Sequence, residues 1–100
     1  MALTVGLLAT LTAKPGKESD LADFLVQGQQ IAEAEAGTRV WYAFRIDEST
    51  FGIFDAFDDE DGRQAHLTGQ IPEALGQVGP DLLAADPDIK PVDVLATKPR

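Results

Sequence analysis

The chain has 100 residues, enough for one domain with a single core and too few for two. Hydrophobic residues make up 44% and charged residues 25%, as in ordinary soluble globular proteins, which argues against disorder. A net charge of −9 without any cluster of Lys and Arg disfavours nucleic acids and membrane surfaces as partners. With no cysteine and a single histidine, neither a zinc–thiolate site nor a histidine-rich metal centre is expected.

The N-terminal part of the chain predicts a strand followed by a helix. Residues 3–13 are rich in Leu, Val and Thr and end at the turn formed by residues 14–16. This apolar run is too short to span a bilayer and no basic residue precedes it, so we interpret it as a strand of a cytoplasmic protein. Residues 18–37 then place apolar side chains at helical spacing and end at Gly37.

The middle of the chain predicts a β-hairpin. Residues 38–46 and 50–57 are rich in β-branched and aromatic side chains and are joined by a short polar loop. If the loop has an even number of residues, Tyr42 lies opposite Asp55 on one face of the sheet. A change of one residue in the loop would move every side chain to the other face.

The C-terminal part predicts helical segments and a last strand. Asp58 or Asp59 begins a helix that reaches Leu67, and a further helical pattern is expected to break near Pro80. The apolar segment at residues 89–97 predicts the final strand. The order β-α-β-β-α-β indicates one domain over the whole chain, of the α+β class, with a ferredoxin-like antiparallel sheet and helices on one face.

Both faces of the predicted strand at residues 50–57 carry apolar side chains. Phe51, Ile53 and Phe57 share one face, whereas Phe54 and Ala56 lie on the other. A sheet with helices on one face only should have a polar second face. We therefore expect the second face to pack on another copy of the chain, although scattered exposed apolar residues are common in monomers.

Asp55 and His66 are the residues that could perform chemistry. Asp55 interrupts an apolar strand, so it needs a partner if it lies beneath the helices, and His66 is the only imidazole in the chain. An Asp–His pair suits general acid–base work on a bound phenol. It could equally be a hydrogen bond that only ties the helix to the strand. Gly62 and Gly69, on the same helix face as His66, could make room for a ligand or let the helix approach the sheet.

Three segments, TVGLLATLTAKPGKESDLADFL, EAGTRVWYAF and FDAFDDEDGRQAHL, resemble the antibiotic biosynthesis monooxygenase domain family. This family belongs to the dimeric α/β barrel superfamily, and the Ala65-His66-Leu67 sequence is most similar to its small quinol monooxygenase branch. The resemblance covers nearly the whole chain. It implies a homodimer whose two sheets close into a barrel, with a cavity between sheet and helices in each subunit.

The resemblance also implies an activity. Characterised relatives oxygenate polyphenols or quinols with O2, without metal or flavin, so no cofactor is expected here. By position, Asp55 matches the family's usual Glu, Phe57 its usual Trp and His66 its usual His. Relatives that oxygenate polyketides have Asn where this chain has Ile53, and the haem-degrading branch is disfavoured because the chain contains no asparagine.

The sequence therefore predicts a homodimer that binds a small aromatic molecule and oxygenates it without a cofactor. Asp55 and His66 would handle the phenolic proton, and Tyr42 would orient the polar group of the ring. An apolar wall would be formed by Phe57, Ile53 and Phe44. The alternative is a non-catalytic dimer of the same fold that binds a small molecule.

Overall fold

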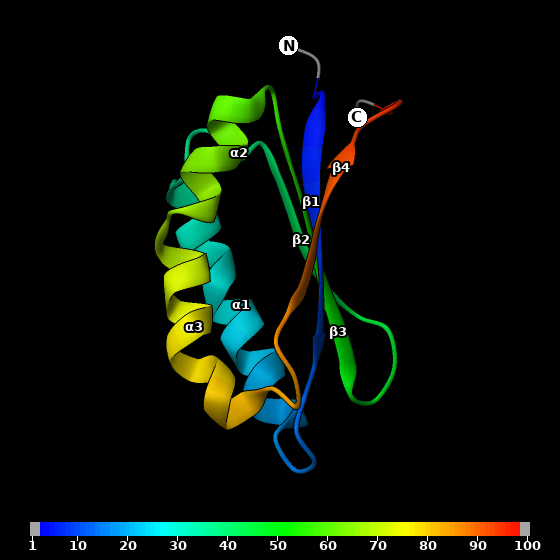
Figure 1. Ribbon diagram of the computed structural model, residues 1–100, viewed down its shortest axis with the longest axis vertical. Coiled ribbons are helices and arrows are strands. Elements are labelled where there is room, and N and C mark those ends of the chain that lie inside the picture. Colours follow the sequence, from blue (N-terminus) through cyan, green and yellow to red (C-terminus); the bar gives the residue numbers. More distant parts are fainter. Residues whose placement is uncertain (1–2, 99–100) are drawn as a thin grey trace.

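The computed structural model describes residues 3–98 and has the predicted α+β fold. A four-stranded antiparallel sheet, in the order β2-β3-β1-β4, is covered on one face by three helices (Figure 1). This strand order is that of a ferredoxin-like fold. The elements, in chain order, are β1 (Val5–Thr12), α1 (Glu18–Ala34), β2 (Val40–Arg45), β3 (Thr50–Phe57), α2 (Glu60–Leu67), α3 (Gln70–Leu82) and β4 (Asp88–Asp93).

The predicted register of the β2–β3 hairpin is wrong by one residue. Trp41, not Tyr42, pairs with Asp55, and Tyr42 pairs with Phe54. Trp41 therefore faces the helices and packs against the core, whereas Tyr42 lies on the opposite face with 61% of its surface exposed. The shift moves the whole of β2 to the other face, because side chains alternate along a strand.

The loop chemistry explains this register. The carboxylate of Asp47 accepts hydrogen bonds from the backbone N–H groups of Ser49 (3.1 Å) and Thr50 (2.9 Å). The N–H of Ile46 donates to the carbonyl of Thr50 at 2.8 Å. An Asp side chain that bonds to N–H groups two and three residues ahead stabilises a turn, and here it closes a loop with an odd number of residues centred on Glu48.

Two helices, α2 and α3, connect β3 to β4, as the sequence suggested, but the second helix is not broken at the expected place. Asp59 begins α2, because its side chain accepts a hydrogen bond from the N–H of Gly62 at 3.1 Å. A short break at Thr68 and Gly69 separates α2 from α3. The expected break near Pro80 does not occur, and α3 continues to Leu82. Pro80 lies in the last turn, so the single helical hydrogen bond that it removes is near the end of α3.

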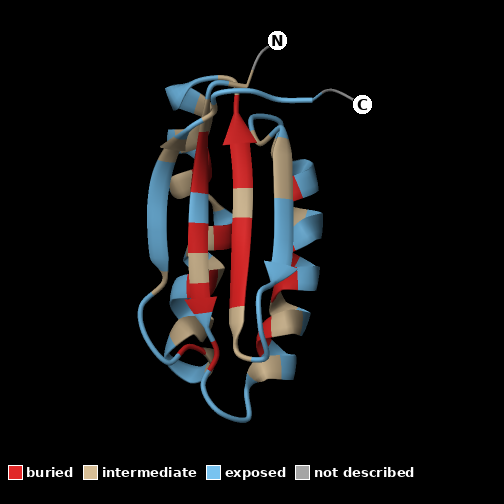
Figure 2. Ribbon diagram, turned by 90° about the vertical axis from the view of Figure 1, so that its right-hand side faces the viewer, coloured by how far each residue is buried: buried red, intermediate tan, exposed pale blue. Residues whose placement is uncertain are grey.

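The central strands β1 and β3 are mostly buried, whereas the edge strands β2 and β4 are mostly exposed (Figure 2). Side chains that face the helices are almost completely buried and form the core together with residues of α1 and α3: Leu7, Ala9, Leu11, Phe51, Ile53 and Phe57. The open face instead presents large hydrophobic side chains to the surroundings: Leu8, Tyr42 and Phe44. Among residues 3–98, no helix is long and apolar enough to cross a membrane.

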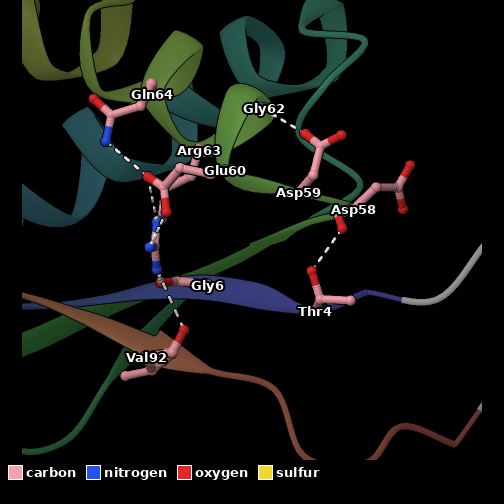
Figure 3. A network of polar contacts seen from close by, with 9 residues as sticks. All are labelled: Thr4, Gly6, Asp58, Asp59, Glu60, Gly62, Arg63, Gln64 and Val92. Carbon is pink, nitrogen blue, oxygen red and sulfur yellow. Dashed lines mark hydrogen bonds and ion pairs between the residues drawn. The ribbon is translucent and has the colours of Figure 1, made fainter.

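Arg63 anchors α2 to the sheet (Figure 3). Its guanidinium donates to the backbone carbonyls of Gly6 (3.2 Å) and Val92 (3.4 Å), which lie side by side on β1 and β4. The same guanidinium pairs with Glu60, one turn earlier on α2. Since His66 lies one turn after Arg63 on this helix, these contacts fix the position from which the imidazole approaches β3.

Candidate functional site

Asp55 and His66 form the predicted pair on the helix side of the sheet. The distance from Nε2 of His66 to Oδ2 of Asp55 is 3.0 Å. Both residues are buried, with exposed fractions of 2% for Asp55 and 6% for His66. The ring of Phe57 lies 5.5 Å from the imidazole, centroid to centroid, and packs against it. The expectation that these two residues meet beneath the helices is therefore confirmed.

A second carboxylate completes the site. Oε1 of Glu35, the residue that ends α1, lies 2.8 Å from Nδ1 of His66. The hydroxyl of Thr38 donates to the same carboxylate oxygen at 2.8 Å. His66 therefore lies between two carboxylates, one from the end of α1 and one from the centre of β3.

The two contacts of the imidazole favour a site that holds two protons. A neutral imidazole donates from one nitrogen only, so the other would direct a lone pair at a carboxylate oxygen. Both contacts become hydrogen bonds when the three groups share two protons, as in an imidazolium between two carboxylates. Burial by itself lowers the pKa of His66, but the hydrogen bonds that the imidazole donates to Asp55 and Glu35, together with the charges of these carboxylates, outweigh it and raise that pKa above its ordinary value of 6.5.

Glycines let the polar groups approach closely. A Cβ at Gly62 would lie 3.2 Å from the carbonyl oxygen of Gly37 and 3.3 Å from Cβ of Phe57. A Cβ at Gly69 would lie 3.1 Å from Oε2 of Glu35. Of the two reasons considered for these glycines, close approach is the one that these distances support. The absent side chains allow α2 to pack near β3 and leave space for the Glu35 carboxylate.

Asp55 lines a small cavity between the sheet and α3. The cavity has a volume of about 40 Å³ and is otherwise lined by apolar side chains of the sheet and of α3, together with His66. The second oxygen of Asp55, Oδ1, is buried and has no hydrogen-bond partner among the described residues. A buried acceptor without a donor lowers the stability of the fold by about 1–3 kcal/mol.

Two larger grooves flank this cavity. An open groove of about 600 Å³ lies beside α3 and the segment before β4, and Pro72, Leu75 and Ile89 line both this groove and the cavity. A second groove of about 380 Å³ lies on the other side of His66 and is lined by Glu35, Thr38 and several small residues. The imidazole lines both the internal cavity and the second groove, so it separates them.

The structure brings some of the predicted site residues together and separates others. Ile53 lines the cavity and Phe57 packs against the imidazole, as expected for an apolar wall. Tyr42 and Phe44 were expected at the same site, but the corrected register places them on the open face of the sheet. In their place Trp41 lies directly opposite Asp55, and its indole N–H is buried without a partner among the described residues.

Glu35 was not predicted as a site residue. The sequence Glu35-Ala36-Gly37 begins one of the segments that resemble the monooxygenase family, but nothing in its local pattern indicates a partner for His66. The histidine itself indicates that a second partner exists, because a buried imidazole needs a hydrogen-bond partner at each nitrogen. Within residues 3–98, no group of three or more side chains is arranged to hold a metal ion.

Comparison with solved structures identifies relatives of this chain. The Nitrosomonas europaea protein NE2512, a protein of unknown function, is 49% identical, with 98% of this chain and 95% of that chain covered and a TM-score of 0.96. The chain belongs to the same family as NE2512. No family model matches the sequence, and no curated protein matches it.

More distant structures confirm the predicted fold. A candidate antibiotic biosynthesis monooxygenase from Caulobacter crescentus is 20% identical, with 94% of this chain and 92% of that chain covered and a TM-score of 0.80. Another, from Chloroflexus aurantiacus, is 22% identical, with 96% and 97% covered and a TM-score of 0.74. This chain therefore has the antibiotic biosynthesis monooxygenase fold, as its resemblance to that family implied.

Proposed function

We propose that this protein binds a small phenol or quinol between α3 and the sheet and removes its hydroxyl proton with Asp55. The resulting anion would then react with O2 without a metal or flavin. The observation that carries the proposal is Asp55, which lines a mainly apolar cavity and whose Oδ1 has no hydrogen-bond partner among the described residues.

The aromatic ring needs more space than the cavity of about 40 Å³ provides. Ligand pockets for small molecules usually measure about 300–1,000 Å³. The adjoining groove of about 600 Å³ is within this range, and the side chains of Pro72, Leu75 and Ile89 form the wall between the two. Because α3 packs mainly on α1 and α2, a small movement of α3 away from the sheet would join groove and cavity.

The proposed reaction balances with O2 as the only oxidant. Asp55 takes the proton of the enol or phenol form of the substrate, and the anion gives one electron to O2 to form a radical pair. The pair combines at the ring carbon to form a peroxide. The proton held by Asp55 then passes to the peroxide anion, which frees the base. Loss of water from the resulting hydroperoxide converts the ring carbon that carried the hydrogen to a carbonyl, so one oxygen atom enters the product and the other leaves as water. Ile53 and Phe57 would help to exclude bulk water from the intermediates.

The test measures O2 uptake with a panel of quinols and anthrones, while the fluorescence of Trp41, the only tryptophan, reports binding. Asp55→Asn keeps the shape of the side chain but removes the base, so we expect binding to persist and O2 uptake to fall by at least about 100-fold. Asp81→Asn, which removes a charge from the exposed surface of α3, is the matched control. Full O2 uptake in Asp55→Asn would contradict the proposal.

A second candidate is a non-catalytic protein that binds a small molecule. The small volume of the cavity next to Asp55 favours this function, because a ring cannot reach the carboxylate without movement of α3. In that case the Trp41 fluorescence would change with ligand, but no member of the panel would support O2 uptake by the unmodified protein.

We also propose that two copies of the chain pair through their open sheet faces. Leu8, Tyr42 and Phe44 are large apolar residues exposed on this face of one chain. A 100-residue chain buries only about two-thirds of its surface on folding, so a second copy is a natural cover for this face. Sedimentation at micromolar concentration should give two chains per particle. A stable soluble monomer at that concentration would contradict the pairing.

A further inference from the structure

We infer that His66 stays a fixed cation throughout the reaction and stabilises the negative charge that forms in the cavity, and that Glu35 is the positioning residue that keeps it charged. The reaction itself rests on the proposed function. The charge on His66 does not, and it can be measured without a substrate. His66 transfers no proton in this role, because both nitrogens of the imidazolium donate to carboxylates.

Among the described residues that line the cavity, only His66 can carry a positive charge. Asp55 is the other ionisable residue of the lining, and the rest are apolar side chains of the sheet, α2 and α3. Both ionisable residues are buried. An anion beside such groups is screened little by solvent, so the protein has to supply its counter-ion. The imidazolium of His66 is the group that can do so.

The charge on Asp55 changes during the proposed reaction. Before the reaction its carboxylate is a counter-ion of the imidazolium, with Oδ2 3.0 Å from Nε2 of His66. When Asp55 takes the hydroxyl proton of the substrate it becomes neutral, and the negative charge is then on the substrate and, after electron transfer, on the reduced oxygen. The imidazolium remains beside this new anion. Because the positive charge is in place before the anion forms, the site does not have to reorganise.

A buried imidazolium loses its proton more readily when its neighbour becomes neutral. Burial is the largest influence on the pKa of His66 and lowers that pKa, whereas the contacts with Asp55 and Glu35 raise it. Once Asp55 is neutral, Glu35 is the carboxylate that remains, with Oε1 2.8 Å from Nδ1 of His66. Two carboxylates at one histidine are therefore useful, because one of them loses its charge in each turnover.

Glu35 is placed to keep its charge while Asp55 changes. It lines the outer groove of about 380 Å³ and not the cavity. Its side chain is 21% exposed and that of Asp55 only 3%, so solvent stabilises the ionised form of Glu35 more. The hydroxyl of Thr38 donates to Oε1 of Glu35 at 2.8 Å, which also favours the carboxylate.

The other elements near His66 bring no further charge to it. The ionisable groups in contact with the imidazole are Asp55 from β3 and Glu35 after α1, and the hydroxyl of Thr38 is uncharged. Arg63, one turn earlier on α2, is directed to the backbone of β1 and β4 and to a carboxylate of its own helix. The part of α3 that lines the cavity and the outer groove carries apolar and amide side chains. The charge on His66 therefore depends on the two carboxylates.

The first experiment measures the charge on His66 without any substrate. Because His66 is the only histidine, protein labelled with ¹⁵N-histidine gives one pair of ring-nitrogen signals, and in the unmodified protein their titration midpoint should lie above 6.5. Asp55→Asn imitates the neutral form of Asp55 and should lower this midpoint. Glu35→Gln, added to Asp55→Asn, should lower it further by about one pH unit or more.

The matched control for this titration is Glu33→Gln, on the exposed surface of α1, which should leave the midpoint unchanged in the same background. Glu35→Gln keeps the size of the side chain and an oxygen that can accept from Nδ1, so the contact is retained and only the charge is lost. A double variant with the same midpoint as Asp55→Asn alone would overturn the inference.

The second experiment separates the role of the charge from that of a structural contact. At neutral pH, Glu35→Gln should reduce O2 uptake by at least about tenfold, because a group that stabilises a developing anion contributes at least this much. The loss, relative to the unmodified protein at the same pH, should disappear as the pH falls below the midpoint of the variant, where His66 is protonated without Glu35. Full O2 uptake at neutral pH, or a loss that does not change with pH, would overturn the inference.

The two experiments distinguish this inference from the proposed function. If the unmodified protein takes up no O2 with any quinol or anthrone, the proposed function fails, and the catalytic role of His66 fails with it. The ¹⁵N titration still decides whether Glu35 keeps His66 charged. If O2 uptake requires Asp55 but Glu35→Gln shows no loss that depends on pH, the proposed function stands and the inference fails.

Discussion

The two faces of the sheet are built from alternate residues of the same strands and have different roles. On β3, the side chains facing the helices are buried and include the carboxylate of Asp55, which bonds to His66. On the neighbouring β2, Tyr42 and Phe44 project from the opposite face and remain exposed. The covered face can hold a buried ionic group because the helices supply its partners. The open face has no such partners and carries mainly apolar side chains, which suit contact with a second copy.

The sharpest test of this difference compares one phenylalanine from each face. Phe57 is fully buried beneath the helices, so Phe57→Ala should lower the free energy of unfolding by about 3–5 kcal/mol. Phe44→Ala, on the open face, should keep the fold and mainly weaken the association of two chains. Denaturant unfolding and sedimentation of both variants measure the two effects. Equal losses of folding stability in the two variants would show that the faces are equivalent.

Removal of the histidine tests the polar part of the covered face. His66→Ala leaves the buried Asp55 without its partner and removes the hydrogen bond to Glu35, so we expect a loss of about 3–5 kcal/mol in unfolding free energy. Gln64→Ala, on the exposed side of the same helix, is the control and should change little. A variant His66→Ala as stable as the control would mean that the Asp–His pair does not hold α2 to the sheet.

The pH dependence of stability should report the same imidazole. The pKa of His66 is raised in the folded protein, so its stabilisation is complete below about pH 6.5 and is lost as the pH rises through the raised pKa. In that window the free energy of unfolding should fall by up to about 1.4 kcal/mol per pH unit. His66→Gln should remove this slope, which denaturant unfolding at a series of pH values measures. Stability that instead rises with pH across this window would reverse the assignment.

The smallest expected effect distinguishes the two possible hairpin registers. With Tyr42 on the open face, Tyr42→Phe should change the free energy of unfolding by less than about 0.5 kcal/mol and leave O2 uptake unchanged. In the register expected from the sequence, the hydroxyl of Tyr42 would donate a hydrogen bond to Asp55. Removal of this hydroxyl would then leave a buried acceptor without a donor. A large loss of stability or activity in Tyr42→Phe would therefore support the rejected register.

The sequence alone determined the fold and half of the site. Alternating and helical patterns of apolar residues, with acidic and glycine boundaries, were enough to predict the order of strands and helices, because these signals are local. The partnership of Asp55 with His66 followed from a polar residue in an apolar strand and a single available imidazole.

Only the tertiary structure decided the register of β2 and the role of Glu35. The register depends on whether Asp47 bonds to the N–H groups of Ser49 and Thr50, a contact that changes the loop by one residue and so exchanges Trp41 for Tyr42 opposite Asp55. Glu35 and His66 are 31 positions apart and meet because the residues directly after α1 lie against α2. Such contacts between distant segments arise from the packing of whole elements, which no local pattern encodes.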